Sequence, residues 1–136
     1  YLGYERFLAT FRAKPEYAAL RPDVERALRN TALLHRAGVR VGFGTDAGVS
    51  NRVVGFSEHR ELELLVRAGV SAADALKMAT VTSAAILGQA AELGEIAPGR
   101  RADIVVLRAN PLEDVRNTRA IEAVWIDGAH AADALP

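Results

Sequence analysis

Val39-Arg40-Val41-Gly42-Phe43-Gly44-Thr45-Asp46-Ala47 is the stretch of sequence that decides the fold. Its first residues form an apolar run that predicts a short buried strand over 39–44, and a carboxylate, Asp46, follows directly. Carboxylates at the carboxyl ends of parallel strands are where α/β barrels place their catalytic groups. The stretch therefore predicts the last part of a barrel strand with one functional residue at its end.

Helical patterns precede this strand. Residues 4–11 have the apolar spacing of a short amphipathic helix. A second helix is predicted to begin at Pro22, with an acidic residue in its first turn, and Gly38 stands where such a helix would end.

Helical patterns also follow the strand. Ser57 is a candidate N-cap for a helix that Gly69 would end, and Ser71 is a candidate N-cap for the next helix. The β-branched residues around Thr80 predict a break in that helix, after which the alanine-rich residues 84–89 should resume it.

The pattern changes to β after residue 98. Residues 102–107 and 123–126 are predicted to form strands. Asp127-Gly128, directly after the second of these, is a sequence typical of the turn in a β-hairpin. Trp125 is expected to pack in the core of these strands. Because residues 129–136 contain few β-forming side chains, the returning strand should be short or weak.

Composition excludes several classes of function. Of 136 residues, 50% are hydrophobic and 25% charged, and 17 basic residues balance 17 acidic ones, so nothing favours a nucleic acid or an anionic membrane as partner. The absence of cysteine excludes disulfides, thiolate catalysis and Cys-ligated zinc. No apolar run approaches the ~20 residues that span a bilayer. The chain starts at Tyr1 and not at Met, so we expect an internal start, and the compartment stays open with cytoplasm as the default.

Spacing alone leaves two interpretations of Asp46. It could bind a divalent cation through one oxygen and accept a proton from an attacking water through the other. It could equally be the aspartate of a tight turn between Thr45 and Gly48.

A longer ordered pattern favours the first interpretation. The chain resembles the amidohydrolase superfamily, in its imidazolonepropionase-like and prolidase-like branch, over residues 31–128. The resembling segments, in order, are 37–47, 59–64, 68–71, 75–80, 84–88, 94–99, 102–107 and 110–112.

The resemblance implies an α/β fold with parts of two domains. Residues 1–97 would form the C-terminal end of a metal-dependent (β/α)8 TIM barrel, with its last strand and flanking helices. Residues 98–136 would form part of a small composite β-sandwich domain. It implies one or two divalent metals, typically zinc, with Asp46 as metal ligand and general base. The family's other ligands are a His-x-His pair, a carboxylated lysine or a glutamate, and further histidines, each on an earlier barrel strand. This chain has three histidines, His35, His59 and His130, but none forms a His-x-His pair and none lies before Asp46 at the end of a strand. Since zinc sites take three or four ligands, we expect the 136-residue chain alone not to hold a catalytic metal tightly.

Two further residues are candidates for substrate binding. His59 matches a histidine common in that branch, and its alternative is a solvated residue that shares a helix face with Glu63. Arg52 could bind a substrate carboxylate, and its alternative is an exposed side chain. His35 is interpreted as a cation at a helix C-terminus, and His130 as part of an inert tail.

These patterns predict a fragment of a metal-dependent amidohydrolase that hydrolyses a carbon–nitrogen bond in a small amide, cyclic amide or dipeptide-like substrate. The alternative is a non-catalytic α/β module for stability or oligomerisation that lacks a complete metal site. A homo-oligomer is compatible with both. The isolated chain should behave poorly in solution, because helices that cover a barrel would expose apolar faces without it.

Overall fold

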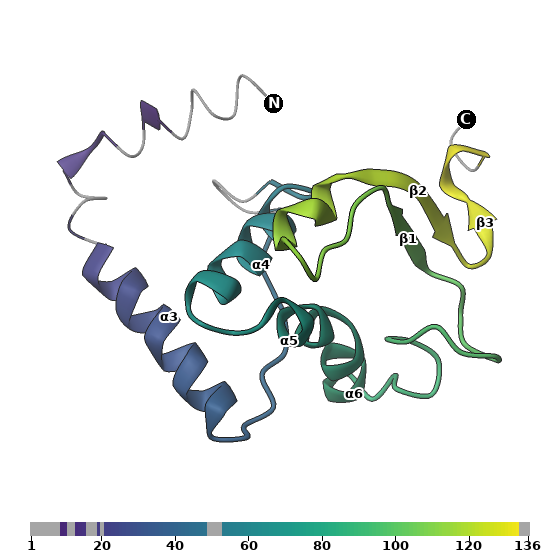
Figure 1. Ribbon diagram of the computed structural model, residues 1–136, viewed down its shortest axis with the longest axis horizontal. Helices are drawn as coiled ribbons and strands as arrows, with labels where there is room; N and C mark the ends of the chain where they lie inside the picture. Colours follow the sequence, from purple (N-terminus) through teal and green to yellow (C-terminus); the bar gives the residue numbers. More distant parts are fainter. Residues whose placement is uncertain (1–8, 11–12, 16–18, 20, 49–52, 134–136) are drawn as a thin grey trace.

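The computed structural model describes residues 9–10, 13–15, 19, 21–48 and 53–133. Figure 1 shows the long helix α3 along one side, the helices α4, α5 and α6 in the centre, and a small sheet on the opposite side. Most of the helix predicted over 4–11, and the candidate residue Arg52, lie outside the described residues.

Helices fill the first two thirds of the described chain, and strands follow. The α-helices are α3 (Arg21–Arg36), α4 (Ser57–Arg67), α5 (Ala72–Lys77) and α6 (Ser83–Ile86), with a π-helical turn, η1 (Met78–Thr82), between the last two. The strands are β1 (Ile104–Leu107), β2 (Ile121–Ile126) and β3 (Ala129–His130), and two 3₁₀-helices are η2 (Val115–Arg119) and η3 (Ala131–Asp133). No helix in the described part is long and apolar enough to cross a membrane.

Local signals place most helix ends correctly. Gly38 and Gly69 adopt positive φ after α3 and α4, where a residue without a Cβ fits best. Ser71 caps α5, because its hydroxyl accepts a hydrogen bond from the Asp74 N–H at 3.0 Å. The prediction for Ser57 was wrong: Phe56 occupies the N-cap position without a side-chain hydrogen bond, and Ser57 is the first residue of α4.

The predicted break near Thr80 takes the form of the π-helical turn η1. The Ser83 hydroxyl donates to the Met78 carbonyl at 2.7 Å, five residues back, and the Thr80 hydroxyl donates to the Leu76 carbonyl at 2.8 Å. These side-chain contacts satisfy carbonyl groups where the regular helical pattern changes. The helix then continues as α6.

The strands form one antiparallel sheet in the order β1-β2-β3. Asp127 and Gly128 make the turn from β2 to β3 with φ of 51° and 80°, the positive values that two-residue hairpins need. As predicted, the returning strand is short, since β3 has two residues. Trp125 was expected in a core, but it is 38% exposed, because no second layer covers the sheet among the described residues. Its ring packs edge-on against the ring of His130, with the two ring centroids 5.0 Å apart. His130 therefore belongs to the sheet, not to an inert tail.

The strand predicted over 39–44 is not formed. Residues 39–46 have no regular secondary structure. A strand needs a neighbouring strand for its backbone hydrogen bonds, and the described strands pair only with one another. The segment still alternates as a strand would: Val41 and Phe43 pack against the buried core, while Gly42 and Gly44 are exposed. The Phe43 N–H donates to the Ser83 hydroxyl at 2.9 Å, which fixes the segment against η1 and α6.

The core lies between α4, α5, η1 and η2. Its buried members are Leu62, Leu65, Val70, Ala75, Met78 and Val115. By contrast, α3 buries Ala32 but leaves Leu33 57% exposed, although both belong to its apolar face. An ion pair between Arg67 and Glu25 links α3 to α4. The apolar face of α3 is thus only partly buried among the described residues.

Candidate functional site

Asp46 stands at the end of the extended segment 39–45, exposed to solvent, with a φ of 53°. This left-handed conformation is uncommon for a residue with a side chain, although aspartate and asparagine tolerate it best. Beside it, the Thr45 hydroxyl accepts a hydrogen bond from the Ala47 N–H at 3.1 Å, a bond that spans Asp46. The turn at Asp46 is thus stabilised by a hydrogen bond to the Thr45 hydroxyl, and the role of the Asp46 carboxylate stays a prediction.

Glu58, in the first turn of α4, contacts both ends of the loop after Asp46. Its Oε1 accepts from the Thr45 hydroxyl at 3.2 Å, and its Oε2 accepts from the Gly55 N–H at 2.8 Å. Sequence analysis missed this residue, since the only signal was an acidic residue in a helix first turn, which is ordinary there.

His59, the next residue, is half-buried and hydrogen-bonded through Nδ1 to the Thr118 hydroxyl of η2 at 2.9 Å. That hydroxyl, itself buried, donates its one proton to the Val115 carbonyl at 2.8 Å. It can therefore only accept from the imidazole, so the neutral ring carries its proton on Nδ1 and keeps a lone pair on Nε2.

Electrostatics favour this neutral form. Burial lowers the pKa of His59 below its ordinary value and Arg119 lowers it further, while Glu58 and Glu63 oppose them. Glu63 accepts from Arg60 at 2.9 Å and from Arg119 at 2.6 Å. The solvated interpretation of His59 is thus wrong, because the ring is tied across 59 residues to η2.

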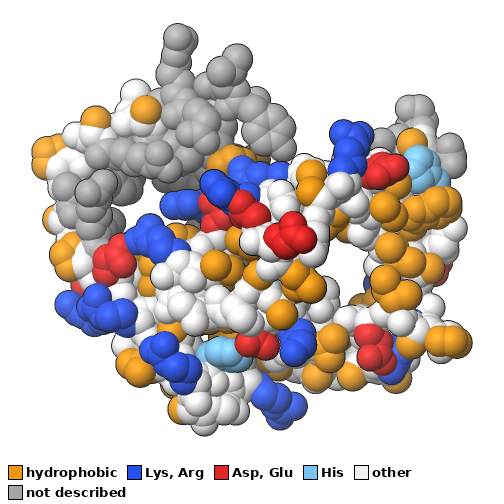
Figure 2. Space-filling view, viewed as in Figure 1, with side chains coloured by type: hydrophobic (Ala, Val, Ile, Leu, Met, Phe, Trp, Pro, Cys, Tyr) orange, Lys and Arg blue, Asp and Glu red, His pale blue; other side chains and the backbone are white. Residues whose placement is uncertain are grey.

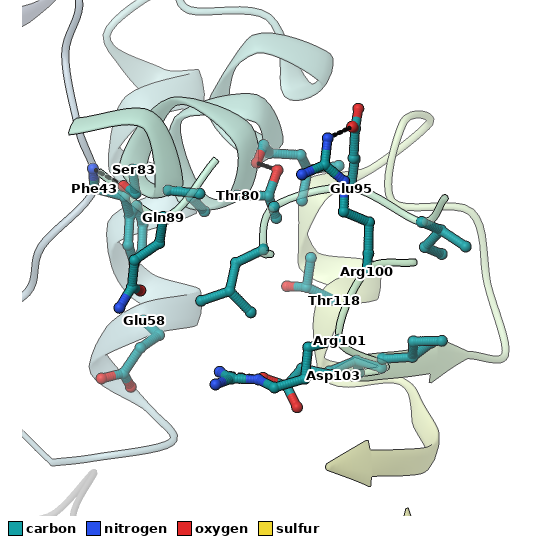
Figure 3. A pocket seen from close by; sticks show the side chains of 18 of the residues that line it. Phe43, Glu58, Thr80, Ser83, Gln89, Glu95, Arg100, Arg101, Asp103 and Thr118 are labelled. Carbon is teal, nitrogen blue, oxygen red and sulfur yellow. Dashed lines mark hydrogen bonds and ion pairs between the residues drawn. The ribbon is translucent and has the colours of Figure 1, made fainter. Parts of the chain in front are cut away.

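An open cavity of about 770 Å³ separates the helices from the sheet. The molecule is hollowed between these two parts in Figure 2, and Figure 3 shows Phe43, Ser83 and Glu58 on the helical side facing Arg101 and Asp103 on the sheet side. His59 also lines this space, but Asp46 does not. We therefore place the candidate site at the Asp46 turn and not in this cavity.

The remaining charged residues singled out from the sequence form surface contacts. His35 lies 3.6 Å from Asp74, and Arg100 and Arg101 pair with Glu95 and Asp103, both at 2.6 Å. His35 lies in the last turn of α3, as predicted.

The described residues do not form a metal site by themselves. They contain no group of three or more His, Cys, Asp or Glu side chains that could hold a metal ion. Asp46 offers carboxylate oxygens, which suit a divalent cation, but zinc takes three or four ligands in proteins. Any further ligands must come from outside the described residues.

Comparison with known proteins decides the family. The model of the family described as "Amidohydrolase family" matches residues 18–130. This chain belongs to the amidohydrolase family. The family generally uses a divalent metal.

Among curated relatives of this amidohydrolase chain, 5-methylthioadenosine/S-adenosylhomocysteine deaminase from Symbiobacterium thermophilum is 37% identical over 87 residues, which are 57% of this chain and 20% of that protein. Ochratoxinase from Aspergillus niger is 33% identical over 98 residues, which are 68% of this chain and 19% of that protein. A solved Xaa-Pro dipeptidase with bound methionine has a TM-score of 0.71 at 30% identity and covers 85% of this chain and 27% of its own. The chain thus spans about a fifth of the curated relatives it matches.

Proposed function

We propose that the protein containing this chain is a metal-dependent amidohydrolase that cleaves a carbon–nitrogen bond in an amide, cyclic amide or dipeptide-like substrate. Residues 1–97 would be the C-terminal end of its (β/α)8 barrel, and residues 98–136 part of a small β-sandwich domain. The observation that carries the proposal is the Asp46 carboxylate, exposed at the end of an extended segment in a chain whose residues 18–130 match the family. A deaminase and a dipeptidase among the similar proteins agree with this reaction class.

In this proposal Asp46 has two tasks. One carboxylate oxygen would help to hold a divalent cation, expected to be zinc, with one or two ions in the site. When bound, the cation would supply activation of a water near neutral pH. The other oxygen of Asp46 would accept a proton from the attacking water, whose oxygen forms a bond to the substrate carbon, and would return that proton to the nitrogen as the carbon–nitrogen bond breaks. The leaving group would thus depart as a neutral amine or ammonia.

Two residues are proposed to contact the small-molecule substrate. The lone pair on Nε2 of His59 can accept a hydrogen bond from a substrate N–H or O–H, because the bond to Thr118 holds the proton on the other nitrogen. Arg52, outside the described residues, is proposed to bind a carboxylate.

Replacement of Asp46 in the whole protein tests the proposal. We expect Asp46→Asn to lower kcat by about 10³-fold or more, because the amide accepts no proton, while folding persists. Asp127→Asn is the matched control: Asp127 has the same left-handed backbone, with a φ of 51°, in the distant β2–β3 turn. Undiminished turnover in Asp46→Asn would overturn the catalytic assignment.

A non-catalytic module is the second candidate. It is favoured by the exposed apolar side chains of α3, such as Leu33, and by the fact that no group of three or more possible metal ligands occurs among the described residues. In that case the protein would form a homo-oligomer through α3, and Leu33→Ser would dissociate it in sedimentation velocity without changing metal content.

A further inference from the structure

We propose that Glu58 is a positioning residue: it holds both ends of the loop that carries Asp46 and thereby keeps that carboxylate in place. This inference rests on the proposed role of Asp46 and deepens it. Glu58 itself touches neither substrate nor reacting atoms in this account.

Glu58 is the final acceptor of a short series of hydrogen bonds. The Ala47 N–H donates to the Thr45 oxygen, and the Thr45 hydroxyl has one proton, which it donates to Glu58 Oε1 at 3.2 Å. From the far end of the loop, the Gly55 N–H donates to Oε2 at 2.8 Å. A carboxylate that accepts at both oxygens thus joins Thr45 to Gly55.

The Thr45 contact distinguishes this arrangement from an ordinary helix start. An acidic residue in the first turn of a helix commonly accepts from a backbone N–H just before the helix, and the Gly55 contact alone would be such a case. The bond to Thr45 reaches 13 residues back, to the residue next to Asp46. Phe56, at the N-cap, supplies no side-chain bond, so Glu58 provides the polar contact at this junction.

Asp46 needs such support because its left-handed backbone is unfavourable for a residue with a side chain. The hydrogen bond from Ala47 to Thr45 spans Asp46 and stabilises this conformation. Glu58 in turn fixes the Thr45 hydroxyl with its lone pair toward Ala47. Loss of Glu58 would let the hydroxyl rotate and the Asp46 turn relax.

A double-mutant cycle in the whole protein tests the proposal. Removal of an outer partner of a metal ligand typically costs 10–100-fold in activity, so we expect Glu58→Ala and Thr45→Val each to lower kcat by about 10–100-fold with KM little changed. The double variant should lose less than the product of the two single losses, since both single variants remove the hydrogen bond between Thr45 and Glu58. Thr45→Ser keeps the hydroxyl and should retain activity. Glu122→Ala, an exposed residue of β2, is the control.

Hydrogen exchange gives a second measurement that needs no activity. In Glu58→Ala, the Ala47 and Gly55 amides should exchange about 10-fold faster or more, while amides of α5 should be unchanged. Unchanged exchange at both amides, a kcat of folded Glu58→Ala within twofold of wild type, or additive losses in the double variant would each overturn the inference.

Asp46→Asn separates failure of this inference from failure of the proposed function. If Asp46→Asn stays active, the proposed function fails whatever Glu58 does. If Asp46→Asn is inactive and Glu58→Ala is fully active with unchanged exchange, only the positioning role fails.

Discussion

Among the glycines that the structure describes, Gly94 is the one where an added methyl group should be most harmful. It has a φ of 99°, and a Cβ built there would lie 2.9 Å from the Ala84 Cβ, 2.9 Å from the Val81 Cα and 3.1 Å from the Thr80 carbonyl oxygen. Two of these three atoms belong to the backbone of η1, so a side-chain rotation cannot relieve the contact. Gly94→Ala must therefore displace the π-helical turn or the loop after α6.

Gly99 provides the matched control. It has a φ of 83°, but a Cβ there would meet no atom within 4 Å. Gly99→Ala should thus cost only the left-handed backbone penalty of about 1–2 kcal/mol. Gly94→Ala should cost the same penalty plus about 1–3 kcal/mol for overpacking. The difference between the two variants isolates the contact with η1.

Hydrogen exchange of the whole protein, followed by mass spectrometry on peptides from residues 78–89, measures this difference. An additional 1–3 kcal/mol corresponds to exchange about 5- to 150-fold faster in Gly94→Ala than in Gly99→Ala. Equal exchange in the two variants, within a factor of two, would refute the close packing of Gly94 on η1.

Three further predictions concern α5, His59 and the isolated chain. Ser71→Ala should destabilise α5 by about 1 kcal/mol through loss of its N-cap, seen as faster exchange in residues 72–77, and Ser57→Ala, which removes no cap, should have little effect. Burial and Arg119 outweigh Glu58 and Glu63 and hold the folded pKa of His59 below its unfolded value of 6.5, so the folded state binds this proton less readily than the unfolded one. The contribution of His59 to stability should therefore be complete above pH 6.5 and fall as the pH drops through that value. His59→Asn, which keeps an N–H for Thr118, should reduce that fall in denaturant titrations. The 136-residue chain alone should self-associate in sedimentation velocity, because α3 exposes Leu33 and Leu34, and a sharp cooperative transition of a monomer would contradict this.

Features that depend on near neighbours in the sequence were predictable. The cap at Ser71, the positive φ at Gly38 and the Asp127-Gly128 turn each follow from local backbone geometry, and the structure confirms them. The family was also recognisable, since the order of many short segments is far more specific than one turn, and the match over residues 18–130 confirms it.

Features that depend on distant partners were not predictable in this way. Residues 39–44 alternate as a strand but lack neighbouring strands, and Trp125 is exposed because no second layer covers the sheet among the described residues. The hydrogen bond between Thr45 and Glu58 joins residues 13 positions apart, the one between His59 and Thr118 joins residues 59 positions apart, and no local pattern signals either one. The roles of Asp46, His59 and Arg52 stay predictions.

The metal content of the whole protein tests the central claim most directly. Wild type, Asp46→Asn and the control Asp127→Asn should be purified in parallel, analysed for bound divalent metals by mass spectrometry, and then titrated with a chelator. The account predicts at least one tightly held divalent ion per chain in wild type and in the control, and weaker retention in Asp46→Asn. Equal metal content and equal resistance to the chelator in all three proteins would contradict the assignment of Asp46 as a metal ligand.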